Sequence, residues 1–429
     1  MWAGFDNFIK GRRADKVINV RSALNNPFSP GADTIPQVWA GRTEQLGDWR
    51  DVVRPRRLAG LPERGRTILG EPGLGKSALV RRIADEAKRA GDWVTPQLRI
   101  PSGADPLKLV ADAVLKLADS AGLASSREHR IGEAIKRVRG VAVSGVSLTL
   151  RGNDGPDPYM ALTDLLIEVG RAAIAKRHVM ALIHIDEVQN ITDDKALSQL
   201  LISLGDALSH EVEVPVPGGE FVSRSLPIAV YLTGLPDFED MTGARKGATF
   251  ARRFKTTTLT AIDEEDLAEA LQEFVLDGWE VADDSGGVSR IRMEPDAASL
   301  VVDVCRGEPF LFQLAGEQAW YAGTGDTVTV DEVRRGWRTA QREAAAHVER
   351  ILERLPSRER QFLNVMAELA PADRTLTRIA QELRLAKATD AGPTAQRLDT
   401  VRGIIGRGKP YTFRHRAVEA YVSSEWPNV

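Results

Sequence analysis

One octapeptide limits what this chain of 429 residues can fold into more than any other feature. Residues Gly70–Ser77 read Gly-Glu-Pro-Gly-Leu-Gly-Lys-Ser. A short apolar run, Thr67–Leu69, precedes the octapeptide, and a stretch with helical periodicity, Ala78–Ile83, follows it. Three glycines between a strand and a helix let the backbone curl tightly, with its N–H groups turned toward an anion. The pattern therefore predicts a phosphate-binding loop that opens a helix.

The positions of this loop have expected roles in binding a nucleoside triphosphate. Lys76 is expected to reach the β- and γ-phosphates, and the Ser77 hydroxyl is expected to ligate Mg²⁺. The helix that begins near Lys76 adds the positive end of its dipole. The residues expected to contact the nucleotide are Gly70, Pro72, Gly73, Leu74, Gly75, Lys76, Ser77 and Ala78. A simple glycine-rich turn is the alternative for such a motif standing alone.

A buried strand that ends in two acids is the second informative feature. The apolar run Val179–Ile185 predicts a strand covered on both faces of a parallel sheet, and Asp186 and Glu187 follow it. Asp186 is expected to hold Mg²⁺ through water, and Glu187 to polarise the attacking water as a general base. An acidic pair that caps the next helix is the alternative. Because the same chain also carries a phosphate loop, the catalytic interpretation is favoured over the capping one.

Two further residues are candidates for the same chemistry. Thr233 follows the next apolar strand, Ile228–Leu232, where its hydroxyl would meet the γ-phosphate or the attacking water. Arg252 and Arg253 precede a possible last strand, Lys255–Ile262. An arginine inserted from a neighbouring subunit can stabilise the charge that develops on a transferred phosphoryl group, and Arg253 is the candidate for that role. A basic pair on a solvated face is the alternative.

The order of the predicted elements indicates the fold class. Strands alternate with helices over residues 67–262, which predicts an α/β fold with a parallel sheet between two helical layers. A hairpin is expected at 141–150 and a polar loop at 211–225, and the pattern is all helical from 263 to 355. The expected domains are an N-terminal segment (1–58), an αβα core (59–262), a helical lid (263–344) and a winged helix-turn-helix domain (345–429).

Composition and charge exclude several classes of protein. The hydrophobic content of 43% and the net charge of −3 are typical of a soluble globular protein. Because the chain lacks an uncharged apolar run of about eighteen residues, no membrane span is expected. The single cysteine, Cys305, can form no internal disulfide, so a cytoplasmic location is expected and a buried thiol is favoured over a reactive one.

These motifs resemble those of the AAA+ superfamily and the related STAND NTPases. The closest resemblance is to bacterial ATP-binding proteins related to the origin-recognition and helicase-loader group. Four further motifs carry it: Asn-Pro-Phe-Ser-Pro-Gly at 26–31, Gly-Arg-Thr-Glu at 41–44, Gly-Leu-Pro at 234–236 and Gly-Glu-Pro-Phe-Leu-Phe-Gln at 307–313. In the Gly-Arg-Thr-Glu motif, Glu44 stands one place nearer to the arginine than the family pattern asks.

The resemblance implies a P-loop NTPase αβα sandwich with five parallel strands and a helical lid, with ATP and Mg²⁺ between them. It implies that the segment around the Gly-Arg motif packs on the adenine, so that Val38 and Arg42 are the candidates there. Helicase loaders carry a phosphate-sensing arginine in the lid where this chain has Phe310. The Gly-x-Pro mode of STAND proteins, with Pro309 as the sensing residue, therefore fits better than sensing by Arg306.

The C-terminal part, which resembles a winged helix-turn-helix, carries a net charge of +4 over residues 356–429. The residues expected to contact nucleic acid are Arg397 and Arg402 in the third helix and Arg407, Lys409 and Arg414 in the wing. The alternative is a module that packs on the ATPase and locks or releases it.

The sequence therefore predicts an ATP-hydrolysing switch of AAA+/STAND type that forms homo-oligomers when ATP-bound and acts on duplex DNA. The alternative is an ATP-gated signalling or defence sensor whose winged helix binds a protein partner. Binding of duplex DNA favours the first function. Binding of a protein partner, without affinity for DNA, favours the second.

Overall fold

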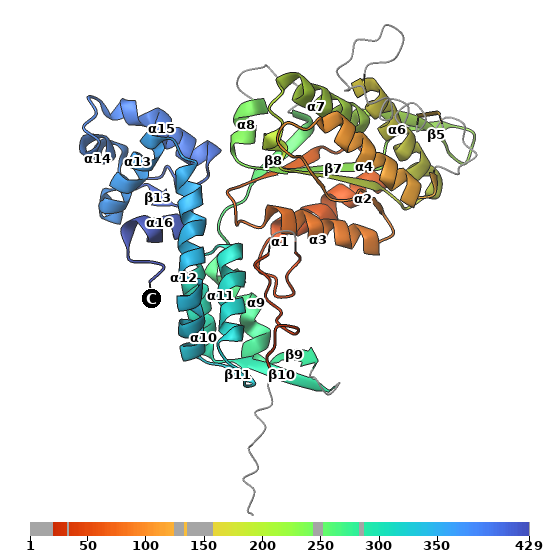
Figure 1. The fold of residues 1–429 in the computed structure, drawn as a ribbon. Helices are drawn as coiled ribbons and strands as arrows, with labels where there is room; N and C mark the ends of the chain where they lie inside the picture. The colour runs from red at the N-terminus through yellow and green to blue at the C-terminus, as the bar shows by residue number, and fades with distance from the viewer. Residues whose placement is uncertain are drawn as a thin grey trace, which may run out of the picture.

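The computed structural model describes residues 20–31, 34–123, 133–134, 158–242, 252–282 and 287–428. Within them the chain forms a helix-covered sheet, a mostly helical lid beneath it and a C-terminal helical part beside the lid (Figure 1). The hairpin expected at 141–150 lies outside the described residues. No helix in the described ranges is long and apolar enough to cross a membrane.

The core contains a parallel sheet in the order β2-β4-β7-β1-β8, with β3 also paired to β4. Its strands are β1 (Gly65–Leu69), β2 (Trp93–Val94), β3 (Leu98–Arg99), β4 (Ala181–Asp186), β7 (Ile228–Gly234) and β8 (Phe254–Thr258). β2 and β3 pair with opposite ends of β4 and form one interrupted edge strand. Pro96 lies between them, and because proline has no N–H to donate, it interrupts the ladder. The five-stranded parallel sheet is thus confirmed, with its edge strand in two pieces.

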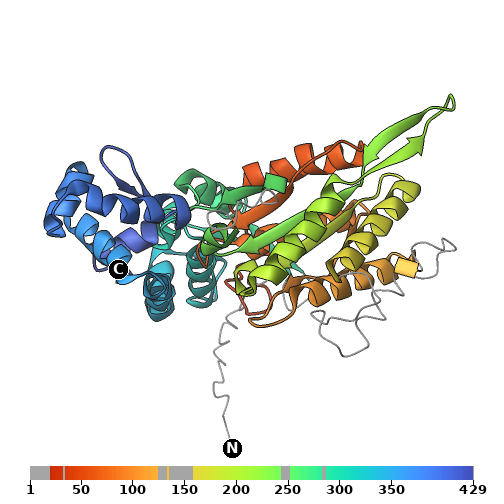
Figure 2. The same ribbon diagram turned by 90° about the horizontal axis from the view of Figure 1, so that it is seen from above.

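Helices cover both faces of this sheet, as an αβα sandwich requires (Figure 2). On one face, α4 (Pro106–Ser120), α6 (Pro158–Lys176) and α7 (Asp194–Ser209) share an apolar core with β4 and β7. On the other face, α3 (Lys76–Arg89) packs with the helical stretch of α1 (Thr43–Gly47), a π-helical turn (Asp48–Val53) and α2 (Arg54–Leu58). The α/β fold predicted from the alternation of elements is confirmed.

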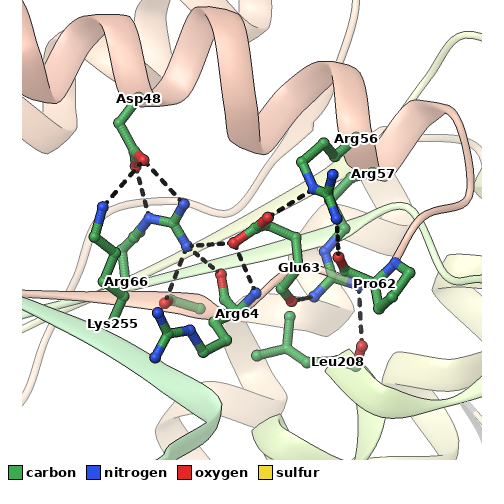
Figure 3. A network of polar contacts seen from close by, with 10 residues as sticks. Asp48, Arg56, Arg57, Pro62, Glu63, Arg64, Arg66, Leu208 and Lys255 are labelled. Carbon is green, nitrogen blue, oxygen red and sulfur yellow. Dashed lines mark hydrogen bonds and ion pairs between the residues drawn. The ribbon is translucent and has the colours of Figure 1, made fainter.

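A network of charged side chains fixes the helical stretch to the amino edge of the sheet (Figure 3). Arg66 of β1 donates from Nε and Nη2 to both carboxylate oxygens of Asp48, at 2.6 and 3.0 Å. Arg66 also donates to Glu63 at 3.1 Å, and the buried Arg57 donates to the carbonyl of Leu208 at 2.9 Å. Burying such charges carries a large desolvation cost, which their pairing and their additional hydrogen bonds offset. The network lies at the edge of the sheet opposite the phosphate loop.

The expectation of a polar loop at 211–225 is wrong, because this segment forms a β-hairpin. β5 (Glu211–Pro215) pairs antiparallel with β6 (Phe221–Ser225), and the hairpin projects from the core (Figure 2). The turn contains Gly218 and Gly219 in positive-φ conformations. The Glu-Val-Glu-Val alternation of β5 is a strand signal that the prolines and glycines of the turn obscure.

The lid contains both helices and strands. It is built from α9 (Glu264–Leu276), β9 (Trp279–Ala282), β10 (Val288–Met293), α10 (Pro295–Cys305), α11 (Pro309–Tyr321), β11 (Thr327–Val328) and α12 (Val330–Glu353). The all-helical expectation is wrong here, since β9, β10 and β11 form a small sheet. Cys305 is fully buried, and burial raises the pKa of its thiol to about 12. Helix α12 runs without a break across the domain boundary expected at 344/345.

The C-terminal part has the helix order of a winged helix-turn-helix. It consists of α13 (Ser357–Glu368), α14 (Leu376–Glu382), α15 (Gly392–Gln396) with a π-helical extension to Val401, β12 (Ile405–Gly406), β13 (Thr412–Phe413) and α16 (Arg416–Ser423). The expected wing is present as the antiparallel β12–β13 pair. This part shares one apolar core with the lid, and Trp426 donates to the carbonyl of Val304 at 3.0 Å.

The N-terminal segment of residues 20–40 runs along the lid before it reaches the core (Figure 1). Arg21 is buried and bonds both carboxylate oxygens of Glu332 at 2.9 Å. Gln313 of α11 accepts from the Ser29 amide at 2.9 Å and donates to the Val38 carbonyl at 2.8 Å. The segment is therefore part of the wall between lid and core.

Candidate active site

The phosphate loop connects β1 to α3, as the octapeptide predicts. Gly73 and Gly75 have φ values of 85° and 78°, a region that favours glycine. Lys76 is buried, and its Nζ donates to the loop carbonyls of Gly70 and Glu71 at 2.9 and 3.0 Å. Burial lowers the pKa of Lys76, and nearby carboxylates oppose that shift. The loop thus surrounds the ammonium group of Lys76 with its own backbone carbonyls at the start of α3.

Asp186 meets the phosphate loop at the carboxyl edge of the sheet. It ends β4, is buried, and accepts a hydrogen bond from the Ser77 hydroxyl at 2.9 Å through Oδ2. Its Oδ1 accepts from the hydroxyl of Thr233, which lies near the end of β7. The sequence predicted that these three residues serve one reaction, and the structure brings their side chains together. Ser77 and Asp186 offer adjacent oxygen atoms, which is the donor set that Mg²⁺ prefers.

Glu187 stands in a left-handed conformation, with φ of 60°, directly after β4. Its amide donates to Oδ1 of Asp186 at 2.9 Å, and its carboxylate accepts from the Gln189 side chain. Gln189 also accepts from the amide of Leu235 at 3.0 Å, so one side chain joins the ends of β4 and β7. Glu187 lines the same cavity as Lys76 and Ser77. Its assignment as general base stays a prediction.

A cavity of about 340 Å³ lies between the core, the lid and the N-terminal segment. Of the expected nucleotide contacts, the cavity is lined by Pro72, Gly73, Gly75, Lys76, Ser77, Ala78, Val38, Arg42 and Pro309. Gly70 and Leu74 contribute through their carbonyls, which accept from Lys76 and from Arg42 at 2.9 Å each. The volume is within the usual range for a small-molecule site.

Two backbone carbonyls hold the Arg42 side chain, which lines the part of the cavity where the family resemblance implies that the adenine binds. Its Nη2 donates to the carbonyls of Leu74 and Thr260 at 2.9 and 2.8 Å. Burial lowers the pKa of Arg42 to about 10, and Asp266 and Asp263 partly offset this effect. Arg42 therefore fixes the N-terminal segment to the phosphate loop through two backbone acceptors.

The lid touches the phosphate loop through Pro309 and its neighbours. The amide of Phe310 donates to the carbonyl of Gly73 at 3.1 Å. Glu308 is fully buried; its Oε2 lies 2.5 Å from Nε2 of His347, and its Oε1 lies 3.0 Å from Nδ1 of His415. One carboxylate of the lid thus contacts both the long helix α12 and the C-terminal part, directly behind the loop.

A second buried carboxylate connects the phosphate loop to α12. Glu71 is 1% exposed and forms an ion pair with Arg354, the residue that follows α12. Burial raises the pKa of Glu71, and the charges of Arg354 and Arg402 oppose that shift. The phosphate loop is therefore joined directly to the end of the helix that leads to the C-terminal part.

Arg253 lies far from its own cavity. It precedes β8, whose first residue pairs with Gly65 at the amino end of β1. The phosphate loop follows the other end of β1, about 16 Å away along five strand residues. Arg253 forms an ion pair with Asp206 of α7. The structure therefore does not bring Arg253 together with the other predicted catalytic residues of the same chain.

The predicted nucleic-acid residues are largely engaged in ion pairs. Arg397 and Arg402 contact Glu359 at 3.1 and 3.2 Å, and Arg402 also lies 2.7 Å from Asp237 in the core. The wing residues Arg407 and Arg414 pair with Asp399 at 2.9 and 2.8 Å, and Lys409 is exposed in the turn between the wing strands. Arg402 is 5% exposed, so this conformation does not present it to a ligand.

Sequence reasoning missed several residues of the site. Arg99 ends β3 and lines the cavity, and the rule that identified Asp186 and Thr233, a polar residue at the end of a parallel strand, could have found it. The Trp39 ring also lines the cavity, with the Arg82 guanidinium 4.5 Å above its centre. The buried contacts of Glu71 and Glu308 have no local sequence signal, because their partners are far along the chain.

The phosphate loop follows β1, and Asp186 ends β4, with β7 lying between these two strands, as in the AAA+ type of P-loop fold. A Walker-type ATPase of Pyrococcus abyssi is similar over 90% of this chain and 96% of its own, with 14% identity and a TM-score of 0.52. The ORC2 protein of Aeropyrum pernix, in ADPNP–ADP complexes, is similar over 92% and 95%, with 18% identity and a TM-score of 0.50. These similarities confirm the predicted fold. No protein-family model and no curated protein matches the sequence.

Proposed function

We propose that this chain binds and hydrolyses ATP and acts as a nucleotide-controlled switch of AAA+/STAND type. The observation that carries the proposal is the contact between Ser77 of the phosphate loop and Asp186 at the end of β4, 2.9 Å apart, with Glu187 at the same cavity. A loop lysine, two oxygen donors and a neighbouring carboxylate are the parts that phosphoryl transfer to water requires. Aeropyrum pernix ORC2, whose structure contains ADPNP and ADP, supports adenine nucleotides as the ligand class.

The chemistry assigns one role to each side chain. Lys76 binds the β- and γ-phosphates, and Ser77 and Asp186 hold Mg²⁺, which neutralises phosphate charge when bound. Glu187 accepts a proton from the attacking water. The water oxygen bonds to the γ-phosphorus while the bond to the β,γ-bridging oxygen breaks, and ADP leaves with that electron pair. Thr233 donates a hydrogen bond to the Asp186 carboxylate and so orients it.

Two substitutions test this assignment. Lys76→Ala should abolish binding of a fluorescent ATP analogue, because the cation that neutralises the phosphates is lost. Glu187→Gln should keep that binding and lower turnover by about 100-fold or more, because the amide cannot accept the proton. Normal hydrolysis by Glu187→Gln would exclude Glu187 as the base. Binding of any purine triphosphate that is unchanged by Lys76→Ala would contradict the site itself.

The proposed action on DNA uses the C-terminal part. Its net positive charge and the exposed Lys409 of the wing turn support contact with a phosphate backbone. Fluorescence anisotropy with duplex DNA, in ATP analogue and in ADP, should detect binding that weakens linearly with the logarithm of salt concentration. Lys409→Ala should reduce that slope by about one. The absence of salt-dependent binding in both nucleotide states would exclude this part of the proposal.

A protein partner is the second candidate, and the ion pairs of the C-terminal part favour it. Four of the five predicted DNA-contacting residues already pair with Glu359, Asp237 or Asp399, which reduces the charge available to phosphates. The chain would then be an ATP-gated signalling or defence sensor. A pull-down with the tagged chain should then recover one protein in stoichiometric amount, and the chain should show no affinity for DNA. That pair of results would favour this function over action on DNA.

Nucleotide-dependent self-association completes the proposal. Arg253 would act in the cavity of a neighbouring copy, since it stands at the opposite edge of the sheet from its own. Mass photometry should find monomers with ADP and larger species with ATP analogue. Arg253→Ala should lower turnover at high protein concentration and leave the rate of dilute protein unchanged.

A further inference from the structure

His184 is a buried polar side chain of β4, and the reaction proposed above gives it no role. It stands two residues before Asp186 and pairs in register with Tyr231 of β7. Because side chains alternate along a strand, His184, Asp186 and Thr233 project from the same face of the sheet. This face packs against α3, which an apolar side chain would do at a lower desolvation cost than an imidazole. The histidine therefore needs an explanation in its hydrogen bonds.

Hydrogen bonds connect the three side chains in one line. Nε2 of His184 lies 3.3 Å from Oγ1 of Thr233, and the Thr233 hydroxyl donates to Oδ1 of Asp186. A threonine hydroxyl has a single proton, and an ionised carboxylate can only accept a hydrogen bond. The bond between His184 and Thr233 must therefore run from Nε2–H of the imidazole to the hydroxyl oxygen.

The direction of this bond determines where the hydroxyl proton points. If Nε2 carried a lone pair, the Thr233 proton could turn toward the imidazole and leave Asp186. A donor at Nε2 keeps that proton on the carboxylate. His184, Thr233 and Asp186 are all buried, so water competes little for these bonds.

The two oxygens of Asp186 have separate partners as a result. Oδ1 accepts from the Thr233 hydroxyl and, at 2.9 Å, from the amide of Glu187. Oδ2 accepts from Ser77 at 2.9 Å and lies 3.9 Å from Nη2 of Arg99. Two donors on Oδ1 fix the plane of the carboxylate and turn Oδ2 toward Ser77, the other expected Mg²⁺ ligand.

We propose that His184 is a positioning residue for the metal site, whose imidazole N–H directs the Thr233 hydroxyl onto Asp186 and so holds Oδ2 in place for Mg²⁺. This inference rests on the proposed ATPase function. The imidazole acts through Thr233 and transfers no proton. Loss of a group that orients a metal ligand lowers metal affinity by about 10- to 100-fold, and the smaller effect is expected here because one residue intervenes.

Binding of Mn²⁺, a paramagnetic substitute for Mg²⁺, tests this role without using turnover. Electron paramagnetic resonance should follow Mn²⁺ titrated into the full chain saturated with a non-hydrolysable ATP analogue. His184→Met, which fills the site without a donor, should weaken Mn²⁺ binding about 10-fold. In His184→Gln the amide N–H stands as many bonds from the backbone as Nε2–H, so this variant should recover most of the affinity.

A double-mutant cycle shows whether the effect passes through Thr233. Thr233→Val should weaken Mn²⁺ binding by itself, and adding His184→Met should then change the affinity by less than about twofold. Thr67→Val makes the same exchange at a buried threonine of β1 that projects from the opposite face to Ile68, and this matched control should leave Mn²⁺ binding unchanged. In EDTA, every variant should bind a fluorescent ATP analogue as the unmodified chain does.

Three results overturn the inference. The first is equal Mn²⁺ affinity in His184→Met and the unmodified chain. The second is the same loss, about 10-fold, on the Thr233→Val background. The third is an equal loss of analogue affinity in EDTA, which would show a general structural effect.

Failure of this inference can be told apart from failure of the proposed function. If the unmodified chain binds the analogue and Glu187→Gln stops its turnover of ATP, any of those three results concerns His184 alone. If the unmodified chain binds no nucleotide, the proposed function and this inference fail together.

Discussion

Gly73 and Gly75 of the phosphate loop allow one quantitative prediction, because they differ in what a side chain would meet. Both have positive φ, so alanine is strained at either position. A Cβ at Gly73 would lie 2.4 Å from Cε1 of His347 and 3.1 Å from Oε2 of Glu308. A Cβ at Gly75 would lie 3.6 Å from Pro309, an ordinary contact. Gly75→Ala therefore adds only backbone strain, whereas Gly73→Ala also displaces His347.

The magnitudes follow from these contacts. A left-handed backbone costs alanine about 1 to 2 kcal/mol, and we expect that loss of unfolding free energy for Gly75→Ala. Displacing His347, which is 6% exposed, separates it from the fully buried Glu308. A buried acceptor that loses its partner costs about 1 to 3 kcal/mol. Gly73→Ala should therefore lower the unfolding free energy by about 2 to 5 kcal/mol.

The assay is urea unfolding without nucleotide, combined with hydrogen exchange of α12. Gly73→Ala should speed amide exchange around His347, and Gly75→Ala should not. In a double-mutant cycle, His347→Ala removes the obstructing ring, so Gly73→Ala on that background should cost no more than Gly75→Ala. The reasoning is refuted if the two glycine variants agree within about 0.5 kcal/mol, or if the extra cost persists without the His347 ring.

Two further variants test other contacts of the structure. Arg402→Ala should lower the unfolding free energy by about 2 to 3 kcal/mol in urea, because it removes a charged partner from the buried Glu359. Arg407→Ala, at an exposed pair with Asp399, should cost less than about 1 kcal/mol, and equal costs would contradict this account. Burial raises the pKa of Cys305 to about 12, so above pH 9 the thiol ionises in the unfolded chain first and stability falls as pH rises toward 12. Compared with Cys305→Ala, the unmodified chain should lose about 1 kcal/mol more between pH 8 and pH 10, and parallel pH profiles would exclude the effect.

Much of the core was predictable because its signals are local. The loop octapeptide, the apolar strand before Asp186 and the strand before Thr233 are each recognised within about ten residues. Their meeting follows from one rule, that parallel strands end at the same edge of a sheet. The structure adds the hydrogen bonds among Ser77, Asp186 and Thr233, while the catalytic roles stay predictions.

The contacts behind the phosphate loop could not be predicted in the same way. Glu308, His347 and His415 meet although long stretches of chain separate them, and no periodic pattern marks a buried polar cluster. The strands β9 and β10 were missed because they are short and largely exposed, so they lack the apolar runs that identify β4. The β5–β6 hairpin was predicted as a loop because the prolines and glycines of its turn are loop signals, and they obscured the polar–apolar alternation of its strands.

The location of Arg253 has a consequence for symmetry. It stands at the amino edge of the sheet, and the cavity lined by the phosphate loop opens at the carboxyl edge. A contact that brings the arginine of one copy to the cavity of another joins two different surfaces, so it is heterologous. Repeating it closes a ring when the rotation between copies divides a full turn, and otherwise extends a helical filament. A two-fold dimer would supply that arginine to both cavities only if one self-complementary patch contained both the arginine and the cavity, which lie at opposite edges of the sheet.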